Sequence, residues 1–125
     1  MKAKEYMKQV QKFDSMIANK TYDMQKLHEI EQKQRAIGND VKEIEEMQRT
    51  LKREIAELTA KRRQIIATIE ELPPIEYDFL FRMYAKGESL YTISEAYNYS
   101  YQWALSTHAK AIKKLQKRLD ASVNN

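Results

Sequence analysis

The side chains with the clearest chemical potential are the cations between Ala109 and Arg118. This stretch holds five of them and no acidic residue: Lys110, Lys113, Lys114, Lys117 and Arg118. Clustered cations on a helix can neutralise phosphates, and each ionic contact makes nucleic-acid binding more sensitive to salt. Basic residues near a helix C-terminus also interact favourably with the helix dipole without any ligand. The cluster alone therefore leaves two interpretations open, phosphate binding and a solvated helix end.

A helix that could carry these cations is predicted to begin just upstream. Ser100 can cap its free N–H groups, and apolar residues recur at helical spacing from Tyr101 to about Leu119. A shorter helix capped by Ser89 precedes it, and Asn98 between the two can adopt the left-handed conformation of a sharp turn. Two helices joined by a tight turn are typical of a helix-turn-helix, whose second helix lies in the major groove of DNA.

This geometry predicts which side chains meet double-stranded DNA. Gln102 could pair with adenine, Leu105 could meet a thymine methyl group, and Ser106 could bond several bases. No operator sequence follows from these contacts. The predicted DNA-binding residues are Ser100, Tyr101, Gln102, Leu105, Ser106, Lys110, Lys113, Lys114 and Lys117.

Aromatic residues are concentrated in the same part of the chain, with nine between residues 77 and 103 against three in residues 1–72. They could form a stacking platform for single-stranded nucleic acid, because every base offers a face to an aromatic ring. We favour a core, because a module of about 50 residues needs large side chains for stability. The predicted core or interface residues are Tyr77, Phe79, Tyr84, Tyr91, Tyr97 and Trp103. Tyr101 is expected opposite the apolar stripe, and His108 either beside Ala104 and Ala111 or near the phosphates.

Two adjacent prolines divide the chain, because they remove backbone donors and end a helix at Leu72. We therefore predict two long helices of coiled-coil and oligomerisation character in residues 1–72, and a helix-turn-helix domain in residues 73–125. The predicted fold class is all-α.

The two long helices are predicted over residues 3–37 and 41–72. Gly38-Asn39 can end the first, and Asp40 with Glu43 forms a capping-box pattern at the start of the second. The second helix carries a heptad seam from Val41 to Leu72, interrupted by Gln48 and Arg62. In the first helix Lys20 occupies a seam position, and the heptad register is expected to shift near Ile30 toward Ile37. The helices could pair within one chain or between chains, and we expect a homodimer or higher homo-oligomer.

Composition excludes several kinds of chemistry. The chain has 125 residues with two Gly, two Pro and no Cys, so disulfides, thiolate zinc sites and cysteine nucleophiles are impossible. His28 and His108 are far apart in sequence, and no phosphate-binding glycine loop occurs. We predict no catalytic residue, metal or cofactor, and no enzymatic activity. No segment approaches about 20 apolar residues, so no membrane association is expected. We expect a soluble, intracellular protein.

The residues from Tyr77 to Leu115 resemble region 4 of sigma-70-type transcription factors. The similarity is strongest over Ile93-Ser94-Glu95-Ala96-Tyr97-Asn98-Tyr99-Ser100 and Ala109-Lys110-Ala111-Ile112-Lys113-Lys114-Leu115. The whole arrangement is similar to small phage transcriptional regulators of the ArpU and RinA type. The resemblance implies a DNA-binding switch for late genes of a phage or prophage, and by analogy a contact with RNA polymerase. It also implies a place in the cytoplasm of a bacterial host, in association with the nucleoid.

The sequence departs from the family pattern at several positions. Ser94 stands where alanine is usual and Thr107 where an aliphatic residue is usual, and the recognition helix begins with the uncharged Tyr101-Gln102-Trp103. The ordinary promoter element is therefore not the expected target. Two alternative functions remain at this stage: a coiled-coil adaptor that binds proteins without reading DNA, and a small terminase subunit that recognises DNA as a ring.

Overall fold

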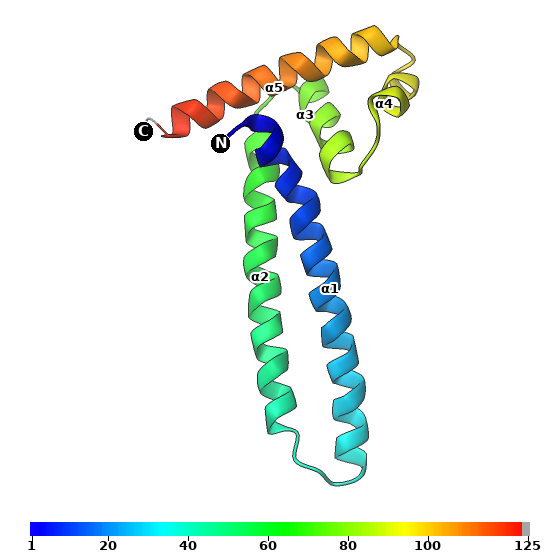
Figure 1. Cartoon of the computed structure of the whole chain (residues 1–125), viewed down its shortest axis with the longest axis vertical. Coiled ribbons are helices and arrows are strands. Elements are labelled where there is room, and N and C mark those ends of the chain that lie inside the picture. Colours follow the sequence, from blue (N-terminus) through cyan, green and yellow to red (C-terminus); the bar gives the residue numbers. More distant parts are fainter. Residues whose placement is uncertain (124–125) are drawn as a thin grey trace. The chain divides into compact units, whose positions relative to one another are not determined.

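The computed structural model describes residues 1–123, and every regular element among them is helical (Figure 1). The elements are α1 (Ala3–Ala36), α2 (Lys42–Glu70), α3 (Pro74–Leu80), a π-helical turn η1 (Phe81–Ala85), α4 (Leu90–Tyr97) and α5 (Tyr101–Val123). The predicted all-α class is thus confirmed. Within the described residues, no helix combines the length and the apolar character needed to cross a membrane.

The chain forms two compact units. We call residues 12–62 the hairpin unit, and residues 1–11 together with the chain from Arg63 onward the core unit. The predicted boundary at Leu72 lies close to the end of α2 at Glu70. The core unit reaches past that boundary, because it includes the start of α1 and the last turns of α2.

In the hairpin unit, α1 and α2 run antiparallel and are joined by ion pairs between their side chains (Figure 1). Lys20 Nζ lies 2.7 Å from Glu54 Oε2, and Arg62 Nε lies 2.6 Å from Asp14 Oδ1. Lys20 and Arg62 are two of the three polar residues predicted at seam positions; the third is Gln48. Lys20 and Arg62 each meet a carboxylate on the other helix, so the seams pair with each other inside one chain.

The seam of α1 keeps its heptad register to the end of the helix. Its half-buried seam positions in the hairpin unit alternate in steps of four and three: Phe13, Ile17, Lys20, Met24, Leu27, Glu31 and Gln34. Asp14 is also half-buried, beside the seam, where it pairs with Arg62. Ile30 and Ile37 are 45% and 70% exposed. The expected register shift toward Ile37 is therefore wrong: the period continues through polar residues, and the two isoleucines face solvent.

Local chemistry explains the turn between α1 and α2. Gly38 has a φ of +82°, and the amides of Gly38 and Asn39 donate to the carbonyls of Arg35 and Gln34 at 3.1 and 2.9 Å. This is the Schellman arrangement, which satisfies carbonyls left free at a helix end. Asp40 Oδ1 accepts from the Lys42 amide at 3.0 Å, so Asp40 caps α2 as predicted.

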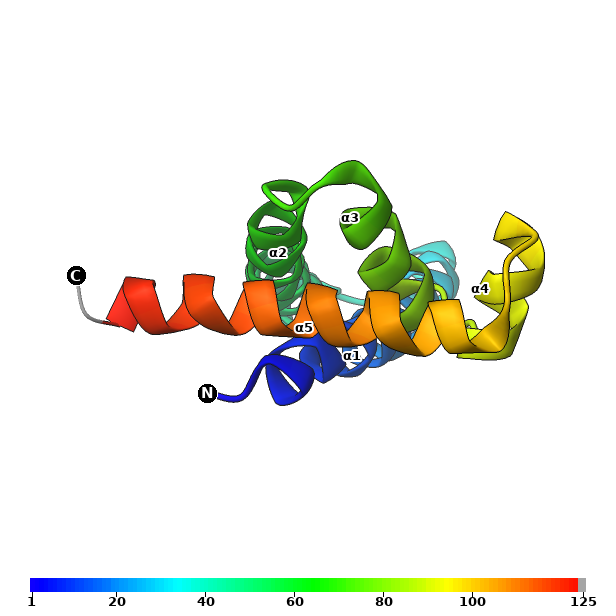
Figure 2. The same ribbon diagram turned by 90° about the horizontal axis from the view of Figure 1, so that it is seen from above.

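The core unit is built around α5. Phe79 of α3, Ile93 of α4 and Ala104 of α5 are fully buried together, with Met83, Leu90, Tyr97 and Trp103 packed around them. Pro74 opens α3, where its missing N–H costs nothing. Within the same unit the first turns of α1 are buried through Ala3, Met7 and Val10. Figure 2 shows this start of α1 alongside α5.

Candidate nucleic-acid interface

Side-chain caps begin α4 and α5, and one left-handed residue makes the turn between them. Ser89 Oγ accepts from the Thr92 amide at 3.1 Å, and Ser100 Oγ accepts from the Trp103 amide at 3.1 Å. Asn98 has a φ of +58°, and the Tyr99 amide donates to the Ser94 carbonyl at 3.0 Å. Both predicted caps and the predicted left-handed position are confirmed.

One side of α5 is buried, and the predicted site residues occupy the rest of its surface. The buried stripe comprises Ala104, Thr107, His108, Ala111 and Leu115. All nine predicted site residues are exposed. Gln102, Ser106 and Lys113 follow one another at steps of four and seven on the side opposite the stripe, because 3.6 residues make one turn. Polar side chains and cations thus share one continuous helix face.

Two of the five cations at the end of α5 are held by carboxylates of the core unit. Lys114 Nζ lies 3.0 Å from Glu76, whose side chain is only 7% exposed. Arg118 bonds the side chain of Glu71 at 2.7 Å and its carbonyl at 3.0 Å. A buried carboxylate needs a paired cation to offset its lost hydration. Lys114 therefore stabilises the fold at Glu76 in addition to lying on the surface.

The other three cations have no such partner. Within residues 1–123, no carboxylate lies within 4.0 Å of the amino groups of Lys110, Lys113 or Lys117. All three are exposed. Between Tyr101 and Leu119, α5 contains no acidic residue. An anion approaching this helix face therefore meets three unpaired ammonium groups.

A polar cluster fixes α4 against α3 and η1. The Tyr97 hydroxyl donates to Asp78 Oδ2, and Arg82 Nε donates to the same oxygen at 3.0 Å. The Arg82 guanidinium also lies 5.7 Å from the centre of the Tyr97 ring. Burial, followed by the hydrogen bond to Asp78, raises the pKa of Tyr97 to about 12. Tyr97 therefore remains a protonated donor at neutral pH, and the cluster holds the short helix α4 in place.

His108 belongs to the interior of the core unit. Its Nε2 is hydrogen-bonded to the Tyr84 hydroxyl at 3.1 Å, and the two rings are stacked with centres 6.1 Å apart. Burial, and secondarily the positive charge of Lys4, lowers the pKa of His108 below 6.5. Of the two expected placements, the structure supports packing beside Ala104 and Ala111.

The aromatic residues divide into buried and exposed groups. Phe79 and Tyr84 are buried, and Trp103 packs between the rings of Phe79 and Tyr97. Tyr91 is 62% exposed in the first turn of α4, so it lies outside the core, and an interface position stays a prediction for it. Tyr99 is also exposed, although its ring lies 4.6 Å from Trp103. The concentration of aromatic residues in the sequence predicted a core, but it gave no sign that Tyr99 lies at the surface.

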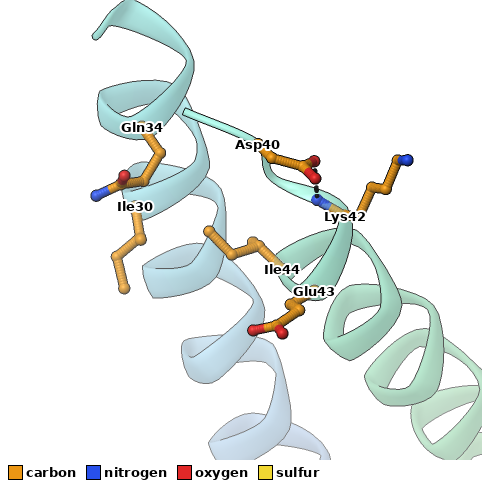
Figure 3. A pocket seen from close by; sticks show the side chains of 6 residues that line it. All are labelled: Ile30, Gln34, Asp40, Lys42, Glu43 and Ile44. Atoms are coloured by element: carbon orange, nitrogen blue, oxygen red, sulfur yellow. Dashed lines mark hydrogen bonds between the residues drawn. The ribbon is translucent and has the colours of Figure 1, made fainter. Parts of the chain in front are cut away.

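Figure 3 shows a pocket of about 430 Å³ in the hairpin unit. Ile30 and Gln34 line it from α1, and Asp40, Lys42, Glu43 and Ile44 line it from the start of α2. Asp40 is already engaged in capping α2 through the Lys42 amide. Within residues 1–123, no three His, Asp or Glu side chains converge to hold a metal ion.

No protein-family model, curated protein or solved structure matches this chain.

Proposed function

We propose that this chain is a sequence-specific regulator of transcription that binds double-stranded DNA through a helix-turn-helix formed by α4 and α5. The observation that carries the proposal is the exposed face of α5, on which Gln102 and Ser106 continue into the unpaired Lys113 and Lys117. Hydrogen-bonding side chains at the start of such a helix can read base edges. Lysines farther along can position the helix on phosphates.

The resemblance to sigma region 4 and to phage regulators supports a role in the bacterial cytoplasm. There the protein would regulate late genes of a phage or prophage, and by analogy contact RNA polymerase. The protein acts without catalysis and without a cofactor. Its target differs from the ordinary promoter element, because Tyr101 and Gln102 are uncharged.

Phosphate contacts are tested by reversing charge at residues that the fold does not use. Lys113→Glu with Lys117→Glu should weaken binding to every duplex and lower the slope of log affinity against log salt by about two. Lys114 is left intact because it pairs with Glu76. Fluorescence anisotropy with a mixed-sequence duplex measures the slope. Lys52→Glu with Lys61→Glu is the matched control, since both lysines are exposed on the hairpin unit. An unchanged slope in the α5 variant would contradict the proposal.

Base reading is tested by Gln102→Ala. Selection of bound sequences from a random duplex pool should show relaxed preference at one position, equivalent to about 1–3 kcal/mol of lost discrimination, with the salt slope unchanged. If the selected sequences were identical for both proteins, Gln102 would have no part in readout.

The same proposal includes self-association through the hairpin unit. Several large apolar side chains remain exposed there although α1 and α2 pair within the chain: Met16, Tyr22, Ile30, Ile37 and Met47. Most seam positions between Phe13 and Ile55 are only half-buried. A second copy would remove this apolar surface from water, which is favourable in proportion to the area buried.

The same exposed side chains favour one alternative, a protein-binding adaptor whose hairpin unit docks on another protein. DNA binding separates the two functions, because an adaptor of this kind reads no sequence. A small terminase subunit would also bind DNA, but its particle mass would correspond to a ring of many chains.

A further inference from the structure

The start of α1 is attached to α5 by hydrogen bonds between its backbone and the Gln116 side chain, and by buried side chains. The Ala3 amide donates to Gln116 Oε1 at 2.8 Å, and Gln116 Nε2 donates to the Met1 carbonyl at 3.2 Å. Ala3 and Met7 are buried in the core unit. The first turns of α1 are therefore held at a fixed position beside α5 (Figure 2).

An open groove of about 930 Å³ lies between these turns and α5. Three lysines line it opposite Ile112 and Gln116 of α5: Lys2, just before α1, and Lys4 and Lys8 of α1. All three are exposed, and within residues 1–123 no carboxylate lies within 4.0 Å of their amino groups. Two carboxylates also line the groove: Glu5, and Asp120, which accepts from Gln116 at 3.1 Å.

The lysines of α1 lie on the opposite flank of α5 from its own unpaired cations. Lys114 points toward α3, where it meets Glu76. Going around the helix away from α3, Lys114 is followed by Lys110 and Lys117, and these by Lys113. Gln116 and Ile112 come last, on the side that faces α1. The face that begins with Gln102 and Ser106 thus has lysines on both sides.

Duplex DNA has the matching charge arrangement. Its major groove is about 12 Å wide and is bordered on each side by a phosphate backbone. A helix lying in that groove has one backbone on each flank, and cations on a single flank reach only one of them.

We propose that Lys4 and Lys8 of α1 bind the phosphate backbone on one side of the groove, while Lys110 and Lys117 of α5 bind the backbone on the other side. The DNA-binding surface is then a cradle of two helices that are far apart in the sequence. The inference rests on the proposed function, and it adds a phosphate-binding element outside the helix-turn-helix. Because Lys4 and Lys8 contact only phosphates, they act equally on all sequences.

The test compares charge removal on the two flanks. Lys4→Gln with Lys8→Gln, and Lys110→Gln with Lys117→Gln, are titrated with the same mixed-sequence duplex between about 50 and 200 mM NaCl. Each double variant should lower the slope of log affinity against log salt by about two. The loss of affinity between the two salt concentrations should therefore be about tenfold smaller for each variant than for the wild-type protein. Sequences selected from a random pool should be unchanged for the α1 variant. Lys33→Gln with Lys52→Gln, exposed on the hairpin unit, is the matched control. Circular dichroism and thermal unfolding establish that each variant is folded.

The outcomes separate this inference from the proposed function. If only the α5 variant lowers the slope, the two-helix cradle is overturned and DNA binding by α5 stands. If only the α1 variant lowers it, α5 does not lie between two backbones and the cradle is also overturned. If the wild-type protein does not bind the duplex at all, both the inference and the proposed function fail. An equal effect of the control variant would show that binding depends on net charge alone and would overturn the cradle.

Discussion

At the scale of single residues, His108 couples the fold to pH. Its neighbours are the Tyr84 hydroxyl, bonded to Nε2, and the cationic Lys4 of α1. Burial and then Lys4 lower the pKa of His108 from 6.5, so the unfolded chain binds this proton more readily than the folded protein. The associated stability is fully present above pH 6.5 and is lost as the pH falls from there through the folded-state pKa.

We therefore expect the free energy of unfolding to fall between pH 7 and pH 5, with His108 contributing at most about 1.4 kcal/mol per pH unit. His108→Gln should remove that part of the pH dependence, because glutamine does not titrate. Urea unfolding followed by circular dichroism at several pH values measures it. Parallel curves for His108→Gln and wild type would refute the coupling.

At the scale of elements, the angle between α4 and α5 depends on one left-handed residue. The Asn98 and Tyr99 amides donate to the carbonyls of Glu95 and Ser94 at 3.0 Å, a second Schellman arrangement. We expect Asn98→Val to destabilise the protein by about 1–2 kcal/mol, because a β-branched residue strongly disfavours positive φ. Asn98→Gly should retain or slightly raise stability, since glycine carries no such penalty. Thermal unfolding compares them, and equal loss in both variants would show that the asparagine side chain matters more than the backbone conformation.

At the scale of the whole molecule, we expect the exposed apolar side chains of the hairpin unit to drive self-association. Multi-angle light scattering at micromolar concentrations should give a mass of two or more chains. Ile30→Glu with Met47→Glu should reduce the mass to one chain without unfolding, because these side chains are 45% and 55% exposed in the single chain. Ile75→Glu, 40% exposed in the core unit, is the control. A wild-type mass of 14.9 kDa at all concentrations would contradict self-association.

Features that depend on neighbours in the chain could be predicted from the sequence. The caps at Ser89 and Ser100, the left-handed Asn98 and the end of α2 near the prolines all follow from interactions within a few residues. The exposed positions of the predicted site residues follow from helical period. The exposure of Tyr91 could not be predicted from its aromatic character, because it depends on which side of the short α4 meets α3 and α5.

The sequence by itself determined the helices, their ends and the polar face of α5, because capping bonds and helical periodicity act over three or four residues. Only the tertiary structure decided which charges are available. It paired Lys114 with Glu76, 38 residues away, and brought the start of α1 against Gln116, 113 residues from Ala3. Contacts across such separations depend on how buried surfaces fit together, and no local pattern encodes them. The seams of α1 and α2 could have paired in either of two ways, and packing within one chain selected the antiparallel pair.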